Sequence, residues 1–280
     1  MALIGAHISV AGGLFKAYER ADDLGCESMQ IFTRNQRQWL NKPLSFQEIE
    51  DFYRASKDSS VKKVVSHASY LINLAGTGEI REKSRDALIK ELERCDHLII
   101  GDVILHPGFA LDLTVEEAWK QVSTSLLEVL DATSEMRVRI LLETMAGQGS
   151  VLGSDIAEFS TLLNLLEDHP RIGFCVDICH VFAAGYEVRT HESYNRLVDI
   201  LQKHVGLGRI HCWHMSDSKM EKNSKKDRHQ HLGEGNIGLN PFSMLINDKR
   251  FEEIPAILET PKEGIGDKGN IALLRKLRGA

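Results

Sequence analysis

The chain has 280 residues, of which 42% are hydrophobic and 26% charged, so it can bury a substantial core and is not a disordered chain. Its formal net charge of −6 argues against a generally basic nucleic-acid binder, although bound metal ions would add charge that this sum omits. The sequence lacks an apolar run near the roughly 20 residues of a membrane span, which excludes the usual helical membrane proteins.

The N-terminus and the cysteines favour a cytoplasmic protein. The first residues lack a basic segment, and His7 interrupts their apolar stretch, so a secretory signal is not expected. The five cysteines are an odd number without a Cys-x-x-Cys pair, which is typical of free thiols in a reducing compartment. Cys175 and Cys179 are interpreted as small buried residues on a strand and its exit rather than as metal ligands.

Short apolar, β-branched runs alternate along the chain with longer amphipathic stretches. Helical spacing of apolar residues predicts helices over 79–99 and 115–134, and Ser154 with Asp155 provides the N-cap of another. In the first helix the apolar face is Ile80, Ala87, Leu88, Leu92 and Ile99, and in the second it is Val122, Leu126, Leu127 and Leu130. The predicted strands are 3–8, 27–32, 61–67, 102–107, 137–144, 171–178, 209–215 and 255–260.

Eight strands, each followed by a helix or a long loop, predict an α/β protein with the TIM (β/α)8 barrel fold. The chain has no Pro/Gly/Ser-rich linker and no sharp change of composition, so we expect one domain over residues 1–280. A doubly wound sheet with a small extra lobe is the alternative.

Imidazole and carboxylate side chains stand where the predicted strands end. In a TIM barrel these ends meet at one rim, which carries the functional loops. Loop ends exposed to solvent favour Lys, Ser, Asn and Gly, so this pattern indicates a site. The residues are His67, His106, Glu143, Asp177, His180, His214 and Glu259.

The loop sequence DRHQHLGEG, residues 227–235, adds further metal-binding groups. Asp227 and His229 are two residues apart, so both can point to the same side of an extended loop and hold a further ion with His180. His nitrogen with Asp or Glu oxygen is the donor set of zinc, and also of manganese or iron. Clustered carboxylates without cations would repel one another or take up protons, so we expect a multi-metal site.

The glycines of GEGNIG, residues 233–238, match G-x-G-x-x-G but follow a polar loop and lack a βαβ frame, so a turn is expected rather than a dinucleotide site. His7 is expected near the metals without being a ligand.

Nine stretches in the same order resemble the endonuclease IV family of trinuclear-zinc apurinic/apyrimidinic endonucleases. They are IGAHISVAGG (4–13), FTRNQRQW (32–39), HASYLINLA (67–75), LHPG (105–108), LLET (141–144), CVDICHVFAAGY (175–186), HMSDSK (214–219), DRHQHLGEGNIG (227–238) and ILETP (257–261). The resemblance implies a DNA-repair enzyme that cuts 5′ to an abasic site, leaves a 3′-hydroxyl and a 5′-deoxyribose phosphate, and removes 3′-blocking groups by three-metal hydrolysis.

The same resemblance implies the metal ligands. His67 and His106 would bind a first zinc, which Glu143, also expected to be catalytic, bridges to a second. Asp177, His214 and Glu259 would complete the second, and His180, Asp227 and His229 would bind the third. Manganese is an alternative at one position.

Recognition of a missing base requires a bent duplex and an extruded nucleotide, for which planar or apolar wedges are suited. Arg37, Tyr70 and Leu71 are the wedge candidates, on the strength of the resemblance. Arg228 and the lysines at 219, 222, 225 and 226 are candidates for contacts with phosphates, with a solvated loop as the equal alternative. His231 is a candidate phosphate contact or loop-fixing residue, while the role of Met220–Lys226 is open.

Two other functions remain open at this stage. A metal-dependent sugar isomerase or epimerase also uses a barrel with His and carboxylate ligands, but it needs fewer ions. A DNA-damage binder with structural zinc would favour closed, Cys-rich sites instead. The expected partner is double-stranded DNA with abasic sites or blocked 3′ ends, and we expect a monomer without membrane contact.

Overall fold

The computed structural model describes residues 1–39 and 42–279, so residues 40, 41 and 280 of the predicted domain lie outside the described part. Eight parallel strands close into a barrel in the order β1-β10-β7-β6-β5-β4-β3-β2. The closed sheet confirms the TIM barrel and shows that the doubly wound alternative is wrong. The barrel strands are β1 (Leu3–His7), β2 (Ser28–Ile31), β3 (Lys63–His67), β4 (Asp102–Leu105), β5 (Arg139–Glu143), β6 (Ile172–Asp177), β7 (Ile210–Met215) and β10 (Pro255–Leu258).

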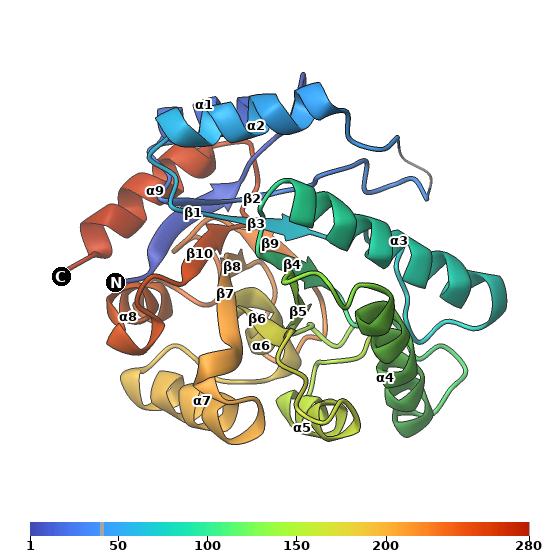
Figure 1. The fold of residues 1–280 in the computed structure, drawn as a ribbon. Helices are drawn as coiled ribbons and strands as arrows, with labels where there is room; N and C mark the ends of the chain where they lie inside the picture. The colour runs from blue at the N-terminus through green and yellow to red at the C-terminus, as the bar shows by residue number, and fades with distance from the viewer. Residues whose placement is uncertain (40–41, 280) are drawn as a thin grey trace.

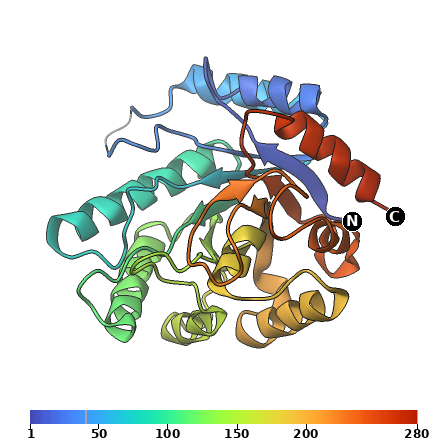
Figure 2. The ribbon, with the colours of Figure 1, turned by 180° about the vertical axis from the view of Figure 1, so that it is seen from behind.

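The helices form a ring around the barrel, and both chain ends lie on the same side of it (Figures 1 and 2). Helix α6 directly follows β6 and lies inside this ring, above the barrel. The helices are α1 (Lys16–Leu24), α2 (Phe46–Asp58), α3 (Gly78–His97), α4 (Val115–Ala132), α5 (Ile156–Leu165), α6 (Ile178–Ala184), α7 (His191–His204), α8 (Asn240–Asn247) and α9 (Gly266–Leu277), with 3-10 turns η1 (Leu207–Arg209) and η2 (Lys249–Phe251).

Two apolar layers hold the strands in place. Because successive strand residues point to opposite faces, one set fills the barrel and the other meets the helices. The helix-facing set joins a continuous core that includes Trp119, Phe159 and Trp213. The barrel interior is filled by Val65, Ile104, Leu141, Cys175, Cys212 and Ile257.

Helix starts follow the capping chemistry of the sequence. Asp155 accepts a hydrogen bond from the Ala157 amide and begins α5, as predicted. Thr114 begins α4 with a reciprocal capping box to Glu117, and the side chain thus satisfies a main-chain donor that the helix itself leaves free.

The prediction that three residues lie on the apolar, packed faces of helices is wrong. Helix α3 ends at His97, and Ile99 lies beyond it with φ of 57° and 77% of its surface exposed. Ile80 is 46% exposed and Leu127 is 45% exposed, because each lies at the margin of the face that packs. Spacing identifies the direction of a face but not its width.

A short antiparallel pair interrupts the barrel pattern after β7. It joins β8 (Asp217–Ser218) to β9 (His229–Gln230), so the loop rich in histidine folds back onto the exit of β7. Within residues 1–39 and 42–279, we find no helix with the length and apolar character needed to cross a bilayer.

Candidate metal centre

The structure places the predicted site residues at the carboxyl ends of the barrel strands. His67, Glu143 and Asp177 are the last residues of β3, β5 and β6. His214 is the penultimate residue of β7, and His106 and Glu259 directly follow β4 and β10. Parallel pairing brings all six ends to one rim of the barrel, because neighbouring strands run in the same direction.

The nine predicted ligands gather into three groups, in each of which the candidate ligand atoms lie within 4.8 Å of one another. Glu143 belongs to two of the groups and so connects them. The groups are His67, His106 and Glu143; then Glu143, Asp177, His214 and Glu259; then His180, Asp227 and His229.

The two carboxylate oxygens of Glu143 face different neighbours. Oε2 lies 3.3 Å from His67 Nε2 and 3.2 Å from His106 Nε2. Oε1 lies 3.0 Å from His214 Nδ1 and 3.3 Å from His180 Nδ1. This buried side chain is therefore placed to share its two oxygens between two cations.

Three of the histidines are held in one tautomer by the main chain. A carbonyl oxygen only accepts, so the ring nitrogen beside it carries a proton, and in the neutral ring the lone pair belongs to the other nitrogen. In each case Nε2 is the nitrogen left with the lone pair. The Nδ1 hydrogen bonds run from His67 to Ala68 O at 2.8 Å, from His180 to Thr144 O at 2.8 Å, and from His229 to Glu259 O at 2.7 Å.

Buried donor atoms at these positions lack hydrogen-bond partners. Among the described residues, Asp177 Oδ2, His180 Nε2 and His229 Nε2 are buried without a well-aligned hydrogen bond, although the two nitrogens lie 3.3 and 3.1 Å from carboxylate oxygens of Asp227. The other oxygen of Asp177 accepts the His180 amide at 2.8 Å and begins α6, so only Oδ2 is turned to the centre. Unpaired buried polar atoms are costly, and divalent cations bound by these groups would satisfy them, so the residues present fit a metal site.

Gln30, on β2, is a site residue that the sequence reasoning missed. Its Nε2 donates to Glu259 Oε1 at 2.6 Å, and its Oε1 accepts from His214 Nε2 at 2.7 Å. The amide thereby orients two predicted ligands and holds His214 with Nδ1 toward the carboxylates. Its Nε2 also lies 2.9 Å from His7 Nδ1, so His7 lies beside the ligands, as expected. A polar residue inside the apolar run ESMQIF was the available signal.

We expect Gln30→Met to weaken metal retention by about 10-fold to 100-fold, since partners that orient a ligand contribute that much to affinity. The measurement is metal loss to a competing chelator. Gln47→Met, on the exposed face of α2, is the matched control. Equal retention by wild type and Gln30→Met would contradict this role of the amide.

Close packing of acids and imidazoles shifts their pKa values in the metal-free protein. Burial alone would raise the pKa of Glu143, but the charges of His214 and His106 outweigh it and hold that pKa well below its usual range. Burial opposes the charged form of His229, yet the Asp227 carboxylate, with Oδ1 3.1 Å from His229 Nε2, and the charge of Asp177 raise its pKa to about 9. Protons thus occupy the donor atoms that a metal would need.

A pH dependence follows for the chelator-treated protein. The raised pKa of His229 stabilises the fold fully below its ordinary value of 6.5, and this contribution is lost as the pH rises through about 9. The lowered pKa of Glu143 stabilises the fold above its ordinary value of 4.5 and is lost in acid. We expect the melting temperature to be highest between pH 4.5 and pH 6.5 and to fall as the pH rises toward 9. A melting temperature that stays constant above pH 6.5 in thermal unfolding experiments would contradict this expectation.

Metal addition should remove that alkaline decline, because imidazoles must lose their protons to bind a cation. Calorimetric titration of the chelated protein in buffers of different ionisation enthalpy is expected to show proton release. An unchanged enthalpy between buffers would indicate that the metals bind elsewhere.

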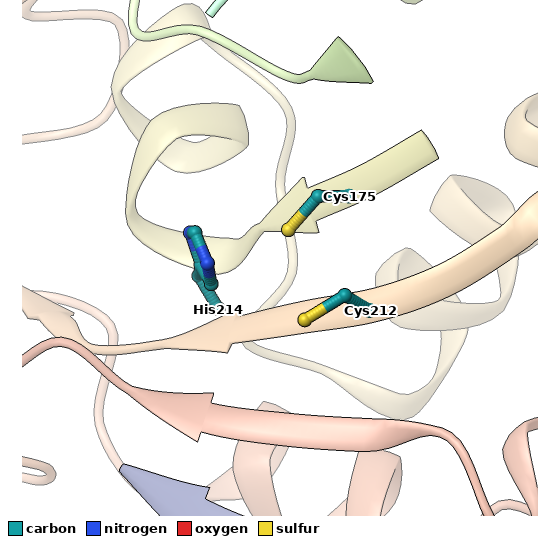
Figure 3. A group of neighbouring side chains, drawn as sticks. All are labelled: Cys175, Cys212 and His214. Atoms are coloured by element: carbon teal, nitrogen blue, oxygen red, sulfur yellow. The ribbon is translucent and has the colours of Figure 1, made fainter. Parts of the chain in front are cut away.

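Cys175 and Cys212, on β6 and β7, lie beside His214 (Figure 3). Burial raises the pKa of the Cys175 thiol well above its usual value, so the sulfur stays protonated. Both nitrogens of His214 are already directed elsewhere, Nδ1 to Glu143 and Nε2 to Gln30. The thiols therefore act as barrel core. Cys179, in α6, is also buried, and its sulfur lies within 4.8 Å of candidate donor atoms of Asp177 and His229, so the interpretation of Cys179 as a packing residue stays a prediction.

A cavity of about 550 Å³ opens above the donor groups. Tyr70 is half exposed in its wall, with its ring centroid 5.1 Å from that of His67 and 5.3 Å from that of His106. Leu71 follows it and is partly buried. Tyr70 therefore lies at the edge of the candidate metal centre, whereas the cavity lining does not include Leu71.

A second cavity, of about 670 Å³, continues the first, since both are lined by His7, Phe32, Gln36 and Lys262. Arg37 is exposed in its wall. The two cavities together form a groove with Tyr70 in the wall of the first part and Arg37 in the wall of the second.

The loop carrying Arg37 is anchored in the protein interior. Arg34 lies 3.2 Å from Glu91 through Nε, and both side chains are almost fully buried. Thr33 and Ser66 donate hydroxyl hydrogen bonds to the other oxygen of Glu91 at 2.7 and 2.6 Å. Helix α3 thus fixes the start of the loop, so Arg37 extends from a rigid base.

The remaining DNA-contact candidates have mixed surroundings. Arg228 is exposed, next to the predicted ligand Asp227. His231 is buried, and its Nδ1 lies 2.9 Å from Asn270 Nδ2, which favours the loop-fixing role over a phosphate contact. Lys222 forms an ion pair with Glu187 at 3.3 Å, and Lys225 donates a hydrogen bond to the Ala184 carbonyl oxygen at 2.5 Å. These two lysines therefore hold the loop in place in addition to giving it positive charge.

Comparison with known proteins gives one consistent family. Residues 18–278 match the model of the xylose isomerase-like TIM barrel family AP_endonuc_2. A "probable endonuclease 4" of Chloroflexus aurantiacus is 43% identical over 99% of this chain and 98% of its own length. The corresponding protein of Geobacter sulfurreducens is 40% identical over 98% of this chain and 93% of its own length.

Solved structures agree with the sequence relatives. The crystal structure of endonuclease IV from Thermus thermophilus superimposes with a TM-score of 0.88 at 33% identity, covering 98% of each chain. A D-tagatose 3-epimerase-like protein superimposes with a TM-score of 0.75 at 22% identity, which shows a shared fold alone. The chain therefore belongs to the endonuclease IV family, whose members are metal-dependent nucleases built on the xylose isomerase-like TIM barrel.

Proposed function

We propose that this protein is a DNA-repair endonuclease that cuts the phosphodiester bond 5′ to abasic sites, giving a 3′-hydroxyl and a 5′-deoxyribose phosphate, and that it also removes 3′-blocking groups. The observation that carries the proposal is the set of three neighbouring donor groups at one rim of the barrel. The names of the relatives, endonuclease 4 and endonuclease IV, support the same class of reaction.

We propose three zinc ions, with manganese as an alternative at one position. The donor groups consist of imidazoles and carboxylates, the set that suits open, catalytic zinc. Three dications would offset the formal charge of −6 and make the mouth of the barrel attractive to a phosphate. When bound, such ions supply a nucleophile at neutral pH and neutralise charge on the phosphate.

The residues of the chain provide rigid geometry for this chemistry. Glu143 holds the first two donor groups in a fixed relation, because its buried carboxylate faces both. Asp177 connects the second group to the third, with Oδ2 3.7 Å from His214 Nδ1 and 3.8 Å from His229 Nε2. Strand ends set these positions before substrate binds, so little reorganisation is needed during the reaction.

The groove beside the metal centre would hold the damaged duplex. Tyr70 and Leu71 would fill the space left by the extruded abasic nucleotide, and Arg37 would support the bent strand from the other part of the groove. Arg228 would add a phosphate contact next to the third donor group, with a contribution that weakens as salt rises.

The test is incubation of the purified protein with a duplex containing one tetrahydrofuran abasic analogue and a label on the 5′ end. We expect a single nick 5′ to the lesion that requires metal and is lost with a chelator, and the intact duplex should remain uncut. A primer ending in 3′-phosphate should be converted to one ending in 3′-hydroxyl. Binding without nicking would favour a DNA-damage binder, while activity on ketoses with no nicking would favour an epimerase.

A further inference from the structure

Asp217 is a buried carboxylate that the metal centre does not use. It lies in β8, directly after the exit of β7 and three residues beyond the predicted ligand His214. Its side chain is fully buried, although no arginine, lysine or histidine is paired with it among the ion pairs of the described residues. An unpaired buried charge is costly, so its partners must come from elsewhere.

Five main-chain N–H groups provide those partners. Oδ1 accepts from Ser218 at 2.7 Å and from Ile237 at 2.8 Å. Oδ2 accepts from three glycines, and all three are those of the G-x-G-x-x-G sequence: Gly233 at 3.0 Å, Gly235 at 3.1 Å and Gly238 at 3.1 Å. The loop is therefore wrapped around a carboxylate of its own chain, and its glycines do not bind a nucleotide.

The glycines are required by this arrangement. Gly233 and Gly238 have φ of +79° and +76°, in the left-handed region that favours glycine. A Cβ on Gly235 would lie 2.4 Å from Asp217 Oδ1 and 2.4 Å from the Ser218 carbonyl oxygen. Main chain and carboxylate thus approach too closely for any other residue.

The β8–β9 pair joins the segment of Asp217 to the segment that carries the predicted ligand His229. Ser218 pairs with His229 and Asp217 with Gln230. The Lys219 amide donates to the Arg228 carbonyl at 2.9 Å, and the Asn236 amide donates to the Ser218 carbonyl at 2.8 Å. Residues on both sides of His229 are thereby fixed to the segment that Asp217 organises.

We propose that Asp217 is a positioning residue that holds the loop from Asp227 to Gly238 over the barrel, and thereby presents Asp227 and His229 to the third metal. This rests on the proposed three-metal function. Charged hydrogen bonds of this kind are stronger than neutral ones, so one side chain can hold a loop that lacks a core of its own. The first two donor groups come from strand ends and do not depend on it.

The test compares Asp217→Asn with wild type by metal content and amide hydrogen exchange. The amide group of asparagine turns a donor toward several N–H groups, so the loop should open. We expect about two metals per chain instead of three, rapid exchange of the Gly233, Gly235 and Gly238 amides, and slow exchange of barrel amides. Nicking should fall by about 10-fold to 100-fold, as for other residues that orient ligands.

Gly235→Ala disrupts the same contact between the loop and Asp217 by a change in the loop instead of the carboxylate. This variant should therefore also lose one metal. Asp102→Asn is the matched control: that buried carboxylate pairs with Arg139 at the opposite end of the barrel, and its loss should lower stability without changing metal content. Should Asp217→Asn misfold, Gly235→Ala alone decides.

Three metals and protected loop amides in the variants would overturn the proposal while leaving wild-type nicking intact. A wild type that neither binds three metals nor nicks would instead contradict the proposed function, and the loss of loop protection in the variants would still report on Asp217.

Discussion

Glu143→Gln is expected to lower the rate of abasic-site nicking by about three orders of magnitude or more. The carboxylate faces two donor groups through separate oxygens, and the neutral amide would present an N–H₂ group to one of them. Bound metals supply several kcal/mol of stabilisation to such a reaction, and each 1.4 kcal/mol is about a factor of ten in rate. The measurement is single-turnover nicking of the lesion duplex at saturating metal.

Glu158→Gln is the control for this change. Glu158 is also a carboxylate with limited exposure, and it accepts from Trp119 Nε1 at 2.9 Å and from the Gly153 amide at 3.0 Å, away from the donor groups. That variant should keep nearly full activity with lower stability. A Glu143→Gln enzyme with near-normal rates would refute the bridging assignment.

Tyr70→Ala is expected to weaken binding to abasic duplex by about tenfold or more while leaving metal content unchanged. A stacking or wedge contact contributes about 1–3 kcal/mol, which corresponds to that range. Arg37→Ala should act in the same direction, since it lines the same groove. Binding is measured by fluorescence anisotropy with a duplex that contains the tetrahydrofuran analogue. The substitutions are made in a catalytically inactive variant, so that the duplex is not cut during the measurement.

The chain offers matched controls for both substitutions. Tyr53 on α2 is 49% exposed, compared with 50% for Tyr70, and it lies outside the groove lining. Arg54 on the same helix pairs with Glu50 at the surface. Tyr53→Ala and Arg54→Ala should leave the affinity unchanged. If Tyr70→Ala and Arg37→Ala bind as tightly as these controls, the wedge proposal fails.

The fold could be predicted from the sequence because its signal is repeated. Eight apolar runs alternate with helical stretches, and each barrel strand of the structure overlaps one of the predicted runs. Element ends were less certain: Ile99 continued the apolar spacing of α3, yet the helix ends at His97. Spacing does not encode where packing stops.

The donor residues could be predicted for a related reason. A strand end fixes the direction of its side chain, so imidazoles and carboxylates at several ends of a closed parallel sheet must converge. His67, Glu143 and Asp177 are in this class. Their assignment as ligands remains a prediction, since the arrangement of donors is not itself a bound metal.

Gln30 and Asp217 could not be recognised in this way. Gln30 acts through hydrogen bonds to side chains from two other strands, and Asp217 acts through main-chain N–H groups up to 21 residues away. Such contacts depend on the completed fold, and an isolated polar residue in a sequence does not reveal its partners. His231 illustrates the converse, because its type suggested a phosphate contact and its burial favours a structural role.

Elemental analysis of the purified, active protein tests the central claim most directly. Three divalent ions per chain are expected, predominantly zinc, with nicking of abasic duplex lost on chelation and restored as the third equivalent is added back. Full nicking activity in protein that carries no more than one ion per chain would contradict the account.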